Sequence, residues 1–435
     1  MEEVKRDVSF DLGKIFIYSS IGIFLFFVPI KINGQSQSLI YHSCDKLQLD
    51  FRPFIQICIV TCILLGILRL VLSYKEKESN IIGFKILIRF ISLIIVISIY
   101  YGNKSLFFIR DDVMQIIDEM IMNLVTILPI SAIFMTFILD YGLLDIVESY
   151  SHKYMKNMFK LSGKTVINIF MFIFTDCFTG IFMTNKLFSS GKIRGSEACI
   201  LILNFSLISL PMFSYISNEL NISRLDVMII NFIVLIIMNM ILCRIYPLNK
   251  KKKSYYIKTE YRETTHKKDK LKKGVNKYLK STCNKSVLRN MFDNLEEAIY
   301  IIIDLIPKII IVMCIGDIII RNQSIVNILG YVIEPFLNLL KIENDGQISN
   351  FIVNALFNDI IAIDTIHTTL SYNLRLLITI IICIKSVSIT GCMLFIGSTN
   401  INISIKDFII LYIERILIIL ILYFLMYYFY IGYIM

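Results

Sequence analysis

The chain contains nine apolar runs, each long enough to cross a bilayer, and this feature limits its fold more than any other. A transmembrane helix needs about 20 apolar residues. Only 18% of the residues are charged and 56% are hydrophobic, whereas soluble domains carry roughly a quarter charged residues. A soluble enzyme, a disordered chain and a small disulfide scaffold are therefore excluded. The runs lie near 13–31, 53–73, 81–101, 120–146, 196–217, 224–247, 293–320, 374–397 and 404–430.

Two shorter segments between these runs, 164–187 and 348–371, are too polar for helices that face lipid. Irregular backbone is tolerated at membrane depth only where it is buried in protein or lines a wet cavity. We therefore expect both segments to form re-entrant hairpins. The stretches before them, 147–161 and 324–342, are amphipathic and should lie in the membrane interface.

The distribution of Lys and Arg predicts the topology. Thirteen Lys and one Arg lie between Lys250 and Lys285, against three acidic residues. Because cytoplasmic loops are enriched in Lys and Arg, the 249–291 loop and the N-terminus should be cytoplasmic. The first apolar run lacks a signal-peptidase site and should be a retained helix. We expect a multi-pass protein of the inner (cytoplasmic) membrane, with lipid and not nucleic acid in contact with the basic loop.

The two halves of the chain resemble each other at an offset of roughly 180 residues. Leu128-Pro129 corresponds to Ile306-Pro307, and Phe174-Thr175-Asp176 corresponds to Phe357-Asn358-Asp359. Three spans per half would place the halves in opposite orientations, which is a transporter design. The sequence thus predicts an all-α polytopic membrane protein with about nine transmembrane helices and two re-entrant hairpins in an inverted repeat. The predicted divisions are a three-helix segment (1–119), a first repeat (120–248), a basic loop (249–291) and a second repeat (292–435).

A family resemblance rests on three stretches of the first half. They are Ile21-Gly22 through Pro29 to Asn33-Gly34, Asp140-Tyr141-Gly142-Leu143-Leu144-Asp145, and Gly180 through Thr184-Asn185-Lys186 to Glu197-Ala198. In this order they resemble the YjiH-type membrane proteins with a nucleoside-recognition (Gate) domain. The resemblance implies a repeat shared with concentrative nucleoside transporters and spore maturation proteins. It does not give a substrate, and Thr175-Asp176-Cys177 departs from the small and hydroxyl residues expected there.

Ionisable residues at membrane depth are costly, so each is a candidate functional residue. Asp176 and Asp359 hold equivalent hairpin positions. We expect them to face a central cavity and to bind a cation, a proton or the polar edge of a substrate. The alternative is that each only caps a helix. The other candidates in the hairpins are Thr179, Thr184, Asn185, Asn358, Asp364, Thr365 and His367.

Further candidates lie on the helices beside the hairpins. Lys385 should pair with Asp359 or Asp364, either to lock the hairpin or to contact an anion. Asn204 and Ser386 mark helices that can unwind and expose backbone to a ligand. His367 could relay protons or only donate a hydrogen bond. Asp304 and Lys308 are spaced to form an ion pair along one helix face.

These features favour a secondary transporter that moves a small polar solute, nucleoside-like or peptide-like, by alternating access with coupling to Na⁺ or H⁺. The alternative is a non-transporting scaffold or complex component, for example in sporulation, and an ion channel is a third hypothesis. No cofactor is expected. No nucleophile–base set or phosphate-binding glycine loop is present, so an enzyme is not expected. A second Gate-type membrane protein or another copy of the chain is the expected protein partner.

Overall fold

The structure is a computed structural model that describes residues 8–32, 35–76, 80–101, 109–206, 210–257, 286–340, 342, 345–364, 370–385 and 389–429. The regular secondary structure of this part is helical apart from an isolated bridge between Arg194 and Tyr255 and one antiparallel ribbon of β1 (Pro29–Ile32) and β2 (Gln35–Ser38). The all-α prediction is thus confirmed, with the ribbon as an exception that it missed.

The N-terminal half contains ten described α-helices. They are α1 (Val8–Phe27), α2 (Leu39–Glu76), α3 (Asn80–Tyr101), α4 (Asp111–Leu139), α5 (Leu143–Phe159), α6 (Thr165–Phe174), α7 (Cys177–Ser189), α8 (Gly195–Phe205), α9 (Leu210–Glu219) and α10 (Arg224–Leu242), followed by the 3₁₀ turn η2 (Leu248–Lys250).

The C-terminal half repeats much of this order. Its helices are α12 (Val287–Arg321), α13 (Gln323–Gly330), α14 (Glu334–Leu339), α15 (Asp345–Phe357), α16 (Asp359–Asp364), α17 (Tyr372–Lys385), the π-helix η3 (Ile389–Met393), α18 (Leu394–Ile396) and α19 (Ile405–Phe429). The shared order begins in each half with a long helix that contains an internal proline, Pro129 in α4 and Pro307 in α12. An amphipathic segment, a hairpin, an interrupted helix and a final long helix follow in both halves.

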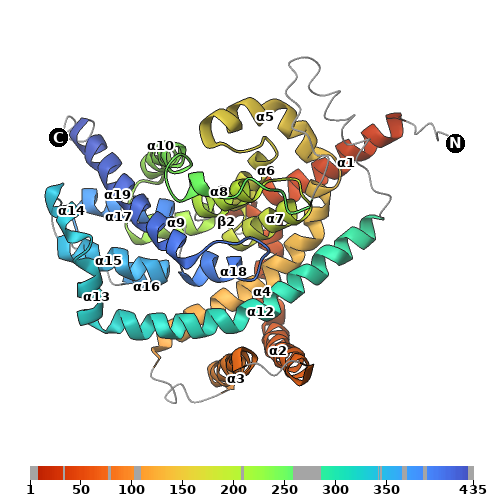
Figure 1. Cartoon of the computed structure of the whole chain (residues 1–435), viewed down its shortest axis with the longest axis horizontal. Coiled ribbons are helices and arrows are strands. Elements are labelled where there is room, and N and C mark those ends of the chain that lie inside the picture. Colours follow the sequence, from red (N-terminus) through yellow and green to blue (C-terminus); the bar gives the residue numbers. More distant parts are fainter. Residues whose placement is uncertain are drawn as a thin grey trace.

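Five helices in the described residues are long and apolar enough to cross a membrane: α2, α3, α4, α12 and α19. The burial of these spans differs: 22% and 33% of the α2 and α3 spans are buried, against 67% and 61% for α4 and α12. Helices α2 and α3 are therefore peripheral, with apolar faces available to lipid, and α4 and α12 form the core. Figure 1 shows α12 running past α4, with α2 and α3 packed together at their side.

Several predicted span boundaries were wrong for local reasons. The first run ends as a helix at Phe27, two residues before Pro29 opens the β-ribbon. The 120–146 run ends at Leu139, because Gly142 adopts a positive φ of 83° and starts the separate helix α5. Residues 39–50 of the expected 32–52 loop are helical, with a kink at Phe51 beside Pro53.

Two predicted spans are interrupted. The 196–217 run divides into α8 and α9, and the 374–397 run divides into α17, η3 and α18. These two interrupted runs, together with α1 and α10, are the four predicted spans that are not among the five long apolar helices. The total of nine membrane crossings therefore stays a prediction, as do the inverted orientation of the halves and the four domain divisions.

An ion-pair network fixes α3 to α12. Arg89 Nη2 lies 3.0 Å from Asp304 Oδ1, and Lys308 Nζ lies 2.5 Å from Asp304 Oδ2. The predicted Asp304–Lys308 pair is confirmed. The network is larger than predicted, because Lys308 also donates to the hydroxyl of Ser398 at 2.9 Å. The N-terminal helices and the loop after α18 are thereby tied to one position on α12.

Candidate functional site

The first hairpin is built from α6 and α7, which pack closely against each other. A Cβ added to Gly180 on α7 would lie 2.3 Å from the Phe172 ring on α6, so only glycine allows this approach. The amide of Asn168 on α6 donates to the Thr184 hydroxyl on α7 at 2.6 Å. Both side chains are buried. The candidate residue Thr184 thus holds the two arms of the hairpin together.

Asp176 lies at the tip of this hairpin and caps α7. Its Oδ1 accepts a hydrogen bond from the Thr179 backbone N–H at 2.6 Å, which satisfies one of the free donors at the helix start. Tyr41 on α2 donates to the carbonyl of Thr175 at 2.8 Å and so fixes the tip from the other side. The buried Thr179 hydroxyl faces Ser131 on α4 at 3.5 Å. The capping role, given above as the alternative, is present in the structure.

Asn185 connects the first hairpin to two segments of the second half. Its amide donates to Glu297 on α12 at 3.0 Å, and its Oδ1 accepts the backbone N–H of Asn400 at 3.0 Å. Lys186, the next residue, pairs with the same Glu297 carboxylate. Asn185 is only 2% exposed. Its hydrogen bonds are therefore used for docking the hairpin onto α12 and the loop after α18.

The second hairpin places Asn358 and Asp359 between α15 and α16. Asn358 is buried, and its amide lies 3.5 Å from the sulfur of Met313 on α12. Asp359 begins α16 just as Asp176 precedes α7. This equivalence was expected from the repeated Phe-Thr-Asp and Phe-Asn-Asp sequences.

The two hairpin tips approach one centre. Helix α7, which follows Asp176, and helix α15, which precedes Asp359, both contact η3. The ring of Phe178 stacks on that of Phe395 in α18, with centroids 5.7 Å apart. The two hairpins therefore meet at the interrupted helix at 389–396, where backbone groups outside a regular α-helix can meet a ligand.

A buried arginine, Arg415 on α19, adds a positive group to this region. Its guanidinium donates to the carbonyl of Ile384 at 2.8 Å and to the Oδ1 of Asn204 at 3.1 Å, with the Oδ1 of Asn239 at 3.5 Å. It is 1% exposed. Sequence reasoning missed it, although an arginine inside an apolar span is itself a signal.

Some predicted residues cannot be placed. Thr365, His367 and Ser386 lie outside the described residues. Asp364 ends α16 and Lys385 ends α17, but the positions of their side chains are also outside that description. The predicted pairing of Lys385 with Asp359 or Asp364 therefore stays a prediction. Among the described residues no group of three or more His, Cys, Asp or Glu side chains could hold a metal ion.

A lysine closes the end of the first hairpin. Lys192, in the loop between α7 and α8, donates to the carbonyl of Leu139 at the end of α4, at 2.8 Å. Burial lowers the pKa of Lys192, and the nearby Asp140 carboxylate opposes this by favouring the charged form. The lysine thus fixes the last turn of α4 beside the hairpin.

Comparison with known proteins gives limited information. No family model matches the chain. An uncharacterised protein of Alkalihalophilus pseudofirmus is 23% identical over 358 residues, which cover 76% of this chain and 75% of the relative. The solved structure of CNTnw in an inward-facing substrate-bound state aligns over 95% of this chain and 90% of its own, with a TM-score of 0.38 and 11% identity. The chain is a helical multi-pass membrane protein, and its function has to be argued from its own residues.

Proposed function

We propose that this protein is a secondary transporter that moves a small polar solute across the cytoplasmic membrane by alternating access. The observation that carries the proposal is that two hairpins, with Asp176 and Asp359 at their tips, both contact one interrupted helix. Paired hairpins and broken helices of this kind form substrate and ion sites in transporters, where half-helix ends face the ligand. The ends of α8 and α17 meet at Arg415, which hydrogen-bonds Asn204 and the Ile384 carbonyl.

The solute should be neutral or zwitterionic and rich in hydrogen-bonding groups. The two hairpin carboxylates, the Arg415 guanidinium and the amides of Asn204 and Asn358 are groups that can pair with both donors and acceptors of a ligand. A nucleoside-like or peptide-like solute fits this description. The resemblance to YjiH-type and nucleoside-recognition proteins favours the nucleoside class. The two Asp residues are the proposed sites of coupling to Na⁺ or H⁺.

The proposed topology follows from the basic segment. Lys251 and Lys253 of that segment line the same pocket as Lys156 and Lys160 of the α5 end. Cytoplasmic loops are enriched in such residues. The N-terminus, α5 and the 249–291 loop are accordingly proposed to be cytoplasmic.

The alternative, a non-transporting membrane scaffold, also has support. Asp176, Thr184 and Asn185 all make hydrogen bonds within the protein that account for their presence. If the hairpins only stabilise the fold, the protein would act by binding a second Gate-type protein or another copy of itself. An enzyme is not proposed.

Ligand binding to the purified protein in detergent tests the proposal. Nucleosides, nucleobases, dipeptides and organic acids would each be added with and without Na⁺, and thermal unfolding measured. A ligand at 100 times its dissociation constant stabilises the folded state by about 2.7 kcal/mol. The expected result is a saturable stabilisation by one ligand class that Asp176→Asn or Asp359→Asn removes. Uptake of that ligand into proteoliposomes would follow.

Asp50→Asn is the matched control, because Asp50 is an exposed carboxylate on α2 away from the hairpins. It should keep the wild-type response. If no ligand class stabilises a well-folded protein, or if both hairpin Asp variants still take up the ligand, the transporter proposal is wrong and the scaffold hypothesis is favoured.

A further inference from the structure

A basic pocket lies away from the hairpin centre, at the junction of three segments. It has a volume of about 340 Å³. One wall is the C-terminal part of α5, another is the start of α8, and the third is the chain between the end of α10 and Lys253. Its polar and charged lining residues are His152, Lys156, Lys160, Arg194, Ser196, Glu197, Asn249, Lys251 and Lys253.

The charge of the pocket is strongly positive. Five cationic side chains line it, against the single carboxylate of Glu197. Asp407, which is not among the lining residues, pairs with Lys251 at 2.6 Å. With both carboxylates counted against the five cations, the pocket keeps an excess of three positive charges. Like charges held together in a partly enclosed space repel one another more strongly than in open water. A bound anion would remove this repulsion.

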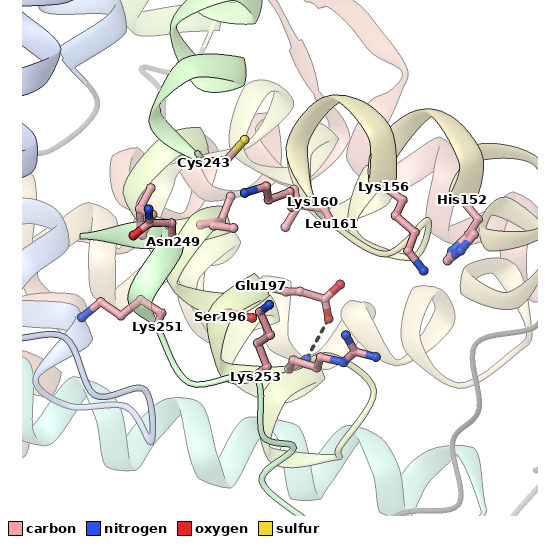
Figure 2. Close-up of a pocket in the computed structure, with 13 residues that line it drawn as sticks. His152, Lys156, Lys160, Leu161, Ser196, Glu197, Cys243, Asn249, Lys251 and Lys253 are labelled. Atoms are coloured by element: carbon pink, nitrogen blue, oxygen red, sulfur yellow. Dashed lines mark hydrogen bonds between the residues drawn. The ribbon is translucent and has the colours of Figure 1, made fainter. Parts of the chain in front are cut away.

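Glu197 is used to build the wall of the pocket. Its Oε1 accepts the backbone N–H of Ser162 at 2.6 Å, and its Oε2 accepts that of Arg194 at 2.8 Å. Figure 2 shows Glu197 between α5 and the start of α8, with the bond to Arg194 dashed. Each carboxylate oxygen is thus bound to backbone, and the carboxylate joins two of the three walls.

The third wall is fixed to the second. Gly195 N–H donates to the Ser254 carbonyl at 2.9 Å, and Arg194 Nε donates to the Tyr255 hydroxyl at 3.2 Å. The Arg194 guanidinium also lies over the Tyr255 ring, 5.4 Å from its centroid, which is a cation–π contact. The pocket is therefore a preformed cavity and not a gap beside a loose chain.

One side chain in the pocket lacks a partner among the described residues, and one neighbouring residue is strained. Both ring nitrogens of His152 are buried without a hydrogen-bond partner in the described part of the chain. Lys160 adopts a left-handed backbone with φ of 57°, where glycine would be less strained. Figure 2 shows Lys156 and His152 leaving α5 on the side toward Glu197. The His152 ring therefore offers an unused hydrogen-bonding group to a ligand.

We propose that this pocket binds a phosphate-bearing anion. Phosphate oxygens accept several charge-assisted hydrogen bonds at once, which matches a cluster of Lys and Arg donors. The start of α8 contributes the positive end of an 11-residue helix on the same side. The anion is either a lipid headgroup, because α5 is an amphipathic helix with exposed Tyr150 and Tyr154, or a free phosphate compound. Both have the same recognition chemistry.

The first arm of the test uses inorganic pyrophosphate and the full-length protein in a neutral detergent. Isothermal titration calorimetry measures its affinity for the wild type and for Lys160→Gln/Lys253→Gln. The matched control is Lys153→Gln/Lys252→Gln, which removes the same charge from exposed lysines that do not line the pocket. The pocket pair should lose about tenfold or more in affinity, which is 1.4 kcal/mol, and the control pair about twofold or less.

The second arm uses nanodiscs of phosphatidylcholine with and without phosphatidylglycerol. If the anion is a lipid headgroup, phosphatidylglycerol raises the unfolding temperature of the wild type and the control pair but not of the pocket pair, and pyrophosphate binds weakly. If the anion is a free phosphate compound, only the pyrophosphate arm separates the two pairs.

The variant Lys160→Gly guards against a folding defect. It relieves the left-handed strain, so it should leave thermal stability unchanged or higher while weakening anion binding in whichever arm responds. The proposal is overturned if neither arm gives a saturable response. It is also overturned if the pocket and control pairs lose affinity equally, since that result reports charge alone.

Discussion

The Arg415 guanidinium donates a hydrogen bond to the Asn204 side chain at 3.1 Å, and this contact joins the last helix of the second half to α8 of the first half. Asn204 is fully buried, and it precedes the end of α8 at Phe205. The same guanidinium binds the carbonyl of Ile384, one residue before α17 ends at Lys385. One arginine therefore stabilises both helix interruptions near the proposed transport site.

We expect Arg415→Lys to reduce the free energy of unfolding by about 1–3 kcal/mol, because a single ammonium leaves buried acceptors without a hydrogen bond. Thermal unfolding in detergent measures the change. Lys406→Gln on the exposed start of the same helix is the control and should stay within about 0.5 kcal/mol of wild type. Equal stability of Arg415→Lys and wild type would show that the guanidinium contacts are dispensable.

We expect Gly180→Ala to destabilise the protein by about 1–3 kcal/mol, because the new methyl group would overlap the Phe172 ring and force the hairpin arms apart. Gly83→Ala on α3 is the matched control. Nothing lies within 4 Å of its added Cβ, so this helical substitution should be neutral or stabilising. Thermal unfolding of the two variants, measured in parallel, tests the hairpin packing. If Gly180→Ala is as stable as Gly83→Ala, the close packing of the hairpin arms is contradicted.

The sequence predicted the elements with the strongest patterns. Apolar length identified the long spans, and the repeated Asp176 and Asp359 motifs located both hairpins, because polar residues inside an apolar stretch need internal partners. The Asp304–Lys308 pair followed from helical spacing alone. These features depend on neighbours in the sequence, which a single chain reveals.

The contacts that a single sequence did not reveal are those between distant segments. Arg89 lies 215 positions from Asp304, and Asn185 lies 112 positions from Glu297. No local pattern relates such residues, so the partners of Asn185 and Arg415 can be identified only in the folded structure. The basic pocket was missed for the same reason, since its lysines come from α5 and from the chain after α10.

We expect Asn185→Asp to destabilise the docking of the first hairpin on α12, because the new carboxylate would face Glu297 and could no longer donate to it. Adding Glu297→Gln should recover part of the loss, since the glutamine amide can donate to the aspartate. A double-mutant cycle measured by thermal unfolding should give a coupling of about 0.5–3 kcal/mol. Additive effects of the two substitutions would mean that the side chains do not interact.

We expect Lys192 to make the protein more stable as the pH rises above neutrality. Burial lowers the pKa of Lys192 in the folded protein, so the unfolded chain binds more protons than the folded chain between the two pKa values. The free energy of unfolding then increases with pH across that interval. Below the folded pKa the lysine is protonated in both states, and the burial cost is present in full.

The variant Lys192→Met isolates this contribution, because it keeps the length of the side chain without the titrating amine. The difference in unfolding temperature between wild type and Lys192→Met should change in favour of wild type as the pH is raised toward the ordinary lysine pKa. Lys153→Met, an exposed lysine on α5, is the control and should show no such trend. A difference that does not vary with pH would mean that the Lys192 amine keeps an ordinary pKa in the folded protein, with its bond to Leu139 replacing the lost hydration.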